Sequence, residues 1–277
     1  MDKAILVADG LTRIHGAGCS QCLTTTGPLF DTNRCSACGA VVAMADVSFA
    51  LHPGEILGIM GESGSGKSTL VKVLHGDLAA SAGTAHFTNG DTSHDLFALN
   101  GAERRALRDR KMGMVHQNPH LGLNFQISCG GNVAERLLMA GERRFTAIRA
   151  RAEKLLARMQ VPTERMDERP GAFSGGMQQR VQIAKALATD PPLLFLDEVT
   201  TGLDVSVQAR ILDLILELQR ETGTAMIVVT HDLGVIRLLA GRTLVMRLGR
   251  VVESGLTDQI LEDPAHPYTQ QLVSAAL

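Results

Sequence analysis

The sequence lacks any apolar run approaching the roughly 20 residues that an α-helix needs to span a bilayer. Residues 1–10 also lack the basic start and long apolar stretch of a secretory signal. The formal net charge is only −2, which argues against a strongly basic nucleic-acid-binding domain. From these absences we expect a cytoplasmic protein with no direct membrane insertion and no direct nucleic-acid partner.

Long linkers, low-complexity tracts and internal repeats are also missing, and 277 residues can bury a substantial core. Hydrophobic residues make up 45% and charged residues 20%, a balance typical of globular soluble proteins. Short β-branched and aliphatic runs alternate with longer amphipathic segments, which indicates an α/β fold. The expected strands are 5–7, 41–51, 55–60, 193–196, 225–229, 244–246 and 250–253, and the expected helices are 67–75, 102–110, 147–159, 178–188 and 207–221.

A glycine-rich segment, Gly-Glu-Ser-Gly-Ser-Gly-Lys-Ser at residues 61–68, has the spacing of a phosphate-binding loop. It follows an expected strand and opens an expected helix, as this motif requires. Its glycines let backbone N–H groups turn toward phosphate oxygens at the positive end of a helix. Lys67 is expected to neutralise the β- and γ-phosphates of ATP, and Ser68 to contact Mg²⁺. The predicted nucleotide-binding residues of this loop are Gly61, Glu62, Ser63, Gly64, Ser65, Gly66, Lys67, Ser68 and Thr69.

Two acids, Asp197 and Glu198, follow the apolar run 193–196. A buried strand would deliver Asp197 to the carboxyl edge of a sheet, where nucleotides bind in open α/β folds. Asp197 suits Mg²⁺, directly or through water, and Glu198 is the candidate base that polarises the attacking water. Many strands end in solvated acids, but the upstream phosphate loop favours ATP hydrolysis.

Four further motifs lie between the phosphate loop and residue 231. Two precede the paired acids, Gln117 and Phe-Ser-Gly-Gly-Met-Gln-Gln-Arg at 173–180, and two follow them, Gly-Leu-Asp at 202–204 and His231. They resemble the Q-loop glutamine, signature loop, D-loop and switch histidine of ABC ATPases. The resemblance implies one ABC ATPase nucleotide-binding domain over residues 1–277. Its parts would be a RecA-like P-loop core, an antiparallel β subdomain and a helical subdomain at about residues 100–170.

The resemblance also implies a division of roles in a head-to-tail dimer, which could be a homodimer or a dimer with a related ABC subunit. Within one protomer, nucleotide, metal or water would be held by Lys67, Ser68, Thr69, Gln117, Asp197, Glu198 and His231. The other protomer would contact the γ-phosphate through Ser174, Gly175 and Gly176. The catalytic residues would be Glu198 as base, His231 as γ-phosphate sensor and Gln117, which with Ser68 would also bind Mg²⁺.

The sequence departs from the family pattern at three positions. Many relatives stack an aromatic side chain on adenine near the end of the first strand, where this chain has His15. An imidazole can stack there, so His15 is a candidate adenine-binding residue. His231 alone could be an ordinary strand-end histidine, but its place after the other motifs favours the sensor role. Met177 replaces a usual Gln and Val199 a usual Pro, and neither change removes a catalytic atom.

Two kinds of ABC ATPase are similar to this chain. The ending at 266–273 resembles both peptide-importer ATPases and the ATP-binding subunit of phosphonate carbon–phosphorus lyase systems. The lyase subunit is resembled by segments 115–119, 122–123, 126–137, 174–180, 182–184 and 202–210. Importer subunits usually continue several dozen residues further. We therefore expect an ATPase that associates with the carbon–phosphorus lyase core complex, with a peptide/nickel-type importer ATPase as the alternative. A third hypothesis is a regulatory module whose nucleotide site acts only as a switch.

Four cysteines form the least expected feature, an insertion at 16–40 between the first two strands. The first pair is Cys19 and Cys22, the second is Cys35 and Cys38, and twelve residues lie between the two pairs. Paired Cys-x2-Cys knuckles at this separation suit tetrahedral, structural Zn²⁺. Redox cysteines and an iron–sulfur centre are the alternatives. Cys129 stands alone and is interpreted as a packed small side chain.

Overall fold

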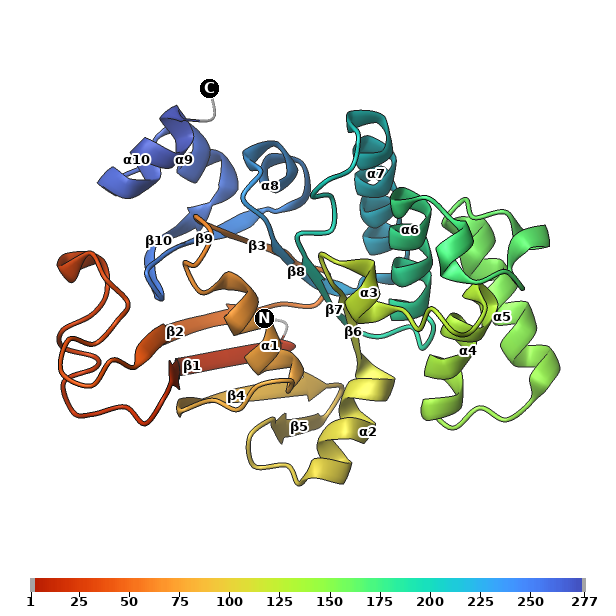
Figure 1. Ribbon diagram of the computed structural model, residues 1–277, viewed down its shortest axis with the longest axis horizontal. Helices are drawn as coiled ribbons and strands as arrows, with labels where there is room; N and C mark the ends of the chain where they lie inside the picture. The colour runs from red at the N-terminus through yellow and green to blue at the C-terminus, as the bar shows by residue number, and fades with distance from the viewer. Residues whose placement is uncertain (1–2, 276–277) are drawn as a thin grey trace. The chain divides into compact units, whose positions relative to one another are not determined.

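The computed structural model describes residues 3–275, whose helices and strands are labelled in Figure 1. The chain comprises two compact units. Unit 1 comprises Met1–Asn100 and Ile227–Leu277, and unit 2 comprises Gly101–Met226. The chain therefore leaves unit 1 once and returns to it. The predicted helical subdomain falls within unit 2, and its boundaries remain a prediction. Nowhere in residues 3–275 is there a helix long and apolar enough to cross a membrane.

The first sheet of unit 1 is antiparallel, with the strand order β2-β1-β4-β5. Its strands are β1 (Leu6–His15), β2 (Val41–Leu51), β4 (Ala82–Asn89) and β5 (Thr92–Asp95). β1 is longer than the predicted range 5–7, because its pairing with β2 continues through register shifts between Ala8 and Ile14. His15 at the end of β1 pairs with Val41 at the start of β2. Residues 16–40 are therefore the connection between two neighbouring strands.

The second group of strands in unit 1 is β3 (Ile56–Met60), β9 (Arg242–Arg247) and β10 (Arg250–Leu256). β3 is parallel to β9, and β9 is antiparallel to β10. Every residue of β3 is buried, which explains why its sequence is a continuous apolar run. The hairpin expected around Gly249 is present: Leu248 and Gly249 adopt left-handed φ values of 46° and 83°. The helices of this unit are α1 (Lys67–His75), α8 (Leu233–Leu239), α9 (Thr257–Glu262) and α10 (Pro267–Ser274), with a 3-10 turn at Pro28–Phe30.

Unit 2 contains a pair of parallel strands, β6 (Met112–Val115) and β7 (Leu193–Asp197). The helices are α2 (Gly101–Lys111), α3 (Pro119–Gly122), α4 (Cys129–Met139), α5 (Phe145–Arg158), α6 (Gly175–Ala186) and α7 (Val205–Thr222), with 3-10 turns at Thr163–Arg165 and Pro170–Ala172. Strand β8 (Ala225–Val229) crosses the boundary between the two units.

Helix α4 lies outside the helices expected from the sequence, and its first turn contains two glycines and an asparagine. Two polar side chains explain its formation. Ser128 caps the helix by accepting a hydrogen bond from Gly131 N. The buried Asn132 amide donates to the carbonyl oxygens of Asn124 and Ser128. These contacts stabilise a helix that intrinsic propensity alone disfavours.

Candidate nucleotide and metal sites

The phosphate loop lies in unit 1, between β3 and α1. The Lys67 ammonium is buried and donates hydrogen bonds to Gly61 O (2.7 Å), Glu62 O (2.8 Å) and Ser65 Oγ (3.5 Å). Gly66 precedes α1 with a left-handed φ of 106°, and the first turn of α1 contains no acidic side chain. The loop therefore combines a held cation with the positive end of a helix, which favours a phosphate group.

Two glycines let this loop approach neighbouring backbone. A Cβ at Gly61 would lie 2.1 Å from Met246 O in β9, and one at Gly66 would lie 2.3 Å from Ala43 O in β2. Gly249 N, in the β9–β10 turn, donates to Ser65 O at 2.9 Å. The curvature of the loop is thus fixed by β2 and the β9–β10 hairpin, and a side chain at either glycine would disturb it.

The paired acids lie in unit 2, at the carboxyl end of β7. Asp197 is buried, and Glu198 adopts a left-handed φ of 49°, which is strained for a residue with a Cβ. Gln117 Nε2 donates to Glu198 Oε2 at 2.9 Å, and Thr201 Oγ1 donates to the same oxygen at 3.3 Å. Two hydrogen bonds therefore orient the carboxylate of Glu198.

Gln117 is held by glutamines that the sequence did not single out. Gln182 Oε1 accepts from His116 N at 2.6 Å, and Gln182 Nε2 donates to His116 O at 3.0 Å. Gln179 Nε2 also donates to His116 O, and both glutamines are buried on α6. The available sequence signal was a pair of glutamines three residues apart, Gln179 at the end of the signature segment and Gln182 just after it. These side chains fix the backbone that presents Gln117.

The signature segment forms the start of α6 in unit 2. Ser174 is the N-cap and its side chain accepts from Met177 N. A Cβ at Gly175 would meet no neighbouring atom, whereas one at Gly176 would lie 2.8 Å from Val207 on α7. Asp204 caps α7, and its hydrogen bond from Ser206 is the main factor that lowers the pKa of its carboxyl group. The segment presents a serine and an open glycine at a helix N-terminus.

The two candidate histidines are in unit 1. His231 is exposed and follows β8, where the neighbouring Thr230 N donates to Ile59 O at 3.2 Å. Asp232 caps α8 by accepting from Gly234 N and Val235 N. His15 is exposed at the end of β1 and immediately precedes the cysteine insertion. The predicted site residues are thus divided, with the phosphate loop and histidines in unit 1 and the remaining motifs in unit 2.

The four inserted cysteines bring their sulfur atoms together in unit 1. All four Sγ atoms lie within 4.8 Å of one another, at 3.8 Å for Cys19–Cys22, 3.7 Å for Cys19–Cys35 and 3.5 Å for Cys22–Cys38. A tetrahedral Zn²⁺ site with Zn–S bonds of ~2.3 Å has sulfur–sulfur edges of about 3.8 Å. A disulfide needs ~2.05 Å. The spacing therefore fits one tetrahedral ion better than a disulfide pair.

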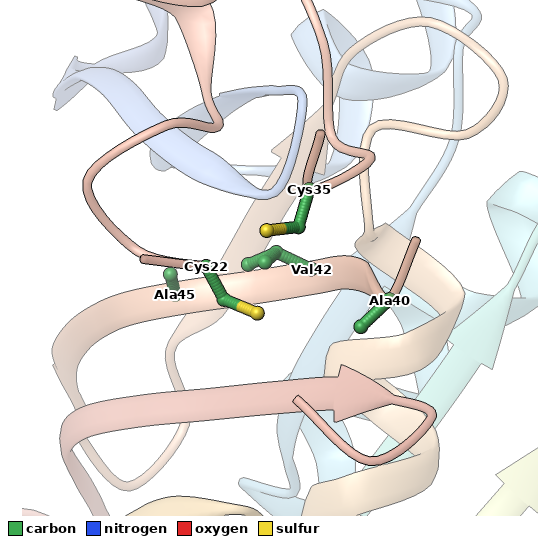
Figure 2. Packing of buried hydrophobic residues seen from close by; sticks show 5 residues of the cluster. All are labelled: Cys22, Cys35, Ala40, Val42 and Ala45. Carbon is green, nitrogen blue, oxygen red and sulfur yellow. The ribbon is translucent and has the colours of Figure 1, made fainter. Parts of the chain in front are cut away.

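Two of the four cysteines pack against the start of β2 and the residue before it. Cys22 and Cys35 are buried against Ala40, Val42 and Ala45 (Figure 2). Cys35 N donates to Ala40 O, and Gly39 N donates to Cys35 O, both at 2.8 Å. A hydrogen bond from the backbone N–H of Cys38 is the main factor that lowers the pKa of the Cys35 thiol, to about 6. The pKa values of the Cys22 and Cys38 thiols are raised, with burial and hydrogen bonds to the neighbouring thiols among the causes. These thiols therefore do not share one protonation behaviour, and the sulfur geometry is the observation that indicates a metal.

Cys129 has a different environment, on α4 in unit 2. It is fully buried, and burial raises the pKa of its thiol to about 11. It therefore has the features of a packed, unreactive side chain.

Comparison with known proteins relates this chain to one sequence family, and to relatives and a solved structure that share its sequence or fold. The sequence profile of the ABC transporter family matches residues 44–201. PhnK of Escherichia coli K12, an ATP-binding protein named for phosphonates utilization, is 55% identical over 233 residues, which cover 84% of this chain and 91% of PhnK. The oligopeptide transport ATP-binding protein OppD of Bacillus subtilis 168 is 40% identical over 242 residues, 86% of this chain and 67% of OppD. The dimeric ATP-binding cassette MJ0796, solved in a post-hydrolysis state with ADP and Pi, has a TM-score of 0.77 and 27% identity, covering 91% of this chain and 98% of that one.

Proposed function

Because this chain belongs to the ABC transporter family, we propose that it closes as a head-to-tail dimer on ATP. It is an ATPase of that family, and its fold is the ABC ATPase fold predicted from the motifs. In the proposed dimer, the phosphate loop of one protomer faces Ser174, Gly175 and Gly176 of the other. The similar solved cassette with ADP and Pi is a dimer, which supports dimerisation.

We assign the metal and base roles from the chemistry of the side chains. Mg²⁺ prefers oxygen ligands, which Ser68, Gln117 and Asp197 offer as hydroxyl, amide and carboxylate. The Gln117 amide donates through its nitrogen to Glu198, so its oxygen remains as the metal-binding atom. When bound, Mg²⁺ neutralises charge on the phosphates. The orientation of Glu198 by Gln117 and Thr201 is the observation that carries this proposal.

The side chains of the site have distinct proposed roles in ATP hydrolysis. Glu198 accepts a proton from water as the water oxygen attacks the γ-phosphorus, and the bond to the β-phosphate oxygen breaks. Lys67 stabilises charge on the β- and γ-phosphates, and His231 contacts the γ-phosphate. The products are ADP and inorganic phosphate. His15 is proposed to contact adenine.

The Glu198→Gln variant tests the catalytic part of this function. It keeps the size and hydrogen-bonding capacity of the side chain but removes the base. We expect phosphate release to fall at least a hundredfold, while ATP binding and ATP-dependent dimerisation persist. Steady-state phosphate assays and gel filtration with ATP measure the two properties. Unchanged phosphate release would reject Glu198 as the base, and turnover absent from the unaltered chain would favour a nucleotide switch.

The proposed biological role is to drive a soluble assembly of phosphonate catabolism in the cytoplasm, by association with the carbon–phosphorus lyase core complex. The support is the 55% identity to PhnK, compared with 40% to the importer subunit OppD. ATP-driven closure would remodel that complex. Affinity purification of the tagged full-length chain from its native cells tests this role. Recovery of lyase subunits supports it, and recovery of membrane permease subunits instead would establish the importer alternative.

We further propose that Cys19, Cys22, Cys35 and Cys38 bind one structural Zn²⁺. Four thiolates fill the tetrahedron and leave no open position for catalysis, so the ion would fix the fold of the insertion. Native mass spectrometry of reduced protein should find one zinc per chain. Cys22→Ser should lose it, and Cys129→Ala should keep it. Metal-free wild-type protein, or bound iron and sulfide, would reject the zinc assignment.

A further inference from the structure

The β9–β10 turn, defined here as residues 247–250, contacts two functional segments at once. On one side, Gly249 N donates to Ser65 O of the phosphate loop at 2.9 Å. On the other side, Arg247 pairs with Asp31 Oδ1 at 2.7 Å, and Arg250 donates to Leu23 O at 2.9 Å. Asp31 and Leu23 belong to the cysteine insertion at residues 16–40, called the ribbon below. The turn therefore connects the ribbon to the phosphate loop within unit 1.

A second connection runs through Tyr268, the only tyrosine of the chain. The Arg247 guanidinium lies over the Tyr268 ring, with Cζ at 5.1 Å from the ring centroid. The Tyr268 hydroxyl accepts a hydrogen bond of 3.0 Å from Glu62 N, inside the phosphate loop. Asp31, Arg247 and Tyr268 thus form a continuous series of contacts, called the relay below, from the ribbon to the loop.

Burial determines where this relay is rigid. Tyr268 is 4% exposed, so its hydroxyl has a fixed position, and loss of the hydrogen bond would free the Glu62 amide. Arg247 and Asp31 are more exposed, with 32% and 79% of their side chains accessible, so their pair contributes little stability alone. Its effect is to orient Arg247, provided that the ribbon holds Asp31 in place.

We propose that the ribbon positions the phosphate loop through the relay, so that metal binding by the four cysteines increases nucleotide affinity. This inference rests on the proposed zinc site. With the ion bound, the ribbon fixes Asp31, Arg247 stays over Tyr268, and Tyr268 holds the Glu62 N–H. Without it, the turn-rich ribbon loses its internal constraint and the loop loses one of its backbone contacts. Tyr268 and Arg247 are therefore positioning residues.

The first test is a double-mutant cycle in the full chain, titrated with a fluorescent ADP analogue at fixed Mg²⁺. Asp31→Asn removes the charge that pairs with Arg247, and Tyr268→Phe removes only the acceptor for Glu62 N. We expect each to weaken binding about two- to fivefold, with zinc content unchanged. The double variant should bind nucleotide about as tightly as the single variant that binds more weakly. The reason is that both substitutions interrupt the same relay. Fully additive losses, or no loss in Tyr268→Phe, would overturn the relay.

A matched control is Arg237→Gln, which removes the exposed pair between Arg237 and Glu262 in the same unit. This pair does not involve the ribbon or the loop, so nucleotide affinity should stay within twofold of wild type. A comparable loss in this variant would mean that the relay variants act through general destabilisation, and would overturn the proposal.

The second test removes the ion with a chelator under reducing conditions. Nucleotide affinity should fall two- to fivefold in the wild type and no further in Tyr268→Phe, and amide exchange in residues 61–66 should quicken. A chain that binds no zinc overturns both the metal site and its control of the loop. If the chain binds zinc but its nucleotide affinity does not change when zinc is removed, only the proposed coupling of the metal site to the loop is overturned. Neither outcome depends on a partner complex, so the proposed lyase role is tested separately.

Discussion

The side-chain amide of Gln117 donates a hydrogen bond of 2.9 Å to the carboxylate of Glu198, a residue 81 positions later in the chain. Glu198 also has a strained left-handed backbone. A strained residue whose carboxylate is oriented by two side chains has a fixed position, which is what a general base needs. The first prediction concerns this contact.

Gln117→Leu keeps a side chain of similar size but removes the donor to Glu198 and the proposed metal ligand. A hydrogen bond to a charged group contributes about 1.5–3 kcal/mol, and each 1.4 kcal/mol changes a rate tenfold. We therefore expect ATP turnover to fall about ten- to a hundredfold, with the structure retained. Single-turnover phosphate release measures this step. Turnover within twofold of wild type would contradict the assignment.

The Gly66→Ala variant should disrupt the phosphate loop. Its added Cβ would lie 2.3 Å from Ala43 O, in a backbone with a φ of 106°. Gly64→Ala is a matched control, because it shares the left-handed φ but its Cβ meets no atom within 4 Å. Both variants carry a strain of about 1–2 kcal/mol, and Gly66→Ala adds about 1–3 kcal/mol for the clash. Thermal unfolding should rank Gly66→Ala below Gly64→Ala, and equal losses would argue against the clash.

Gln182→Leu should destabilise unit 2 by about 1–3 kcal/mol, because it removes the two hydrogen bonds that the buried Gln182 amide makes with the backbone of His116. Urea unfolding measures this loss. Gln259→Leu is the control, since Gln259 is exposed on α9 and should change the free energy of unfolding by less than about 0.5 kcal/mol. A similar small change in Gln182→Leu would show that the buried amide is dispensable.

Glu142 gives a prediction on pH. A hydrogen bond from the Arg144 side chain, with further ones from backbone N–H groups, lowers the pKa of Glu142 from 4.5 to about 2. Because the folded pKa is depressed, its stabilising contribution is complete above pH 4.5 and is lost as pH falls toward 2. Glu142→Gln should therefore be less stable than wild type at neutral pH, with a difference that shrinks between pH 4.5 and 2. Urea titrations across this range test it, and a difference that does not vary with pH would contradict it.

Local sequence patterns were enough to predict the α/β fold class, the ABC ATPase family and the pairing of cysteine knuckles. These features depend on residues close together in the chain. The spacing of residues 61–68 requires a strand, a glycine turn and a helix. Gly249 between two apolar runs predicted the hairpin, and its left-handed φ confirms the turn. Comparison with known proteins confirmed the family and the fold. The roles of the individual site residues stay predictions.

The contacts between distant residues became visible once the chain was seen folded. Tyr268 reaches Glu62 across 206 positions, and Arg247 reaches Asp31 across 216. Gln182 holds His116 across 66 positions, and helix α4 forms because a buried Asn132 satisfies loop carbonyl groups. Spacing in the sequence cannot show such contacts, because they depend on how strands align and which side chains become buried together. That alignment places the cysteine ribbon beside the turn that supports the phosphate loop.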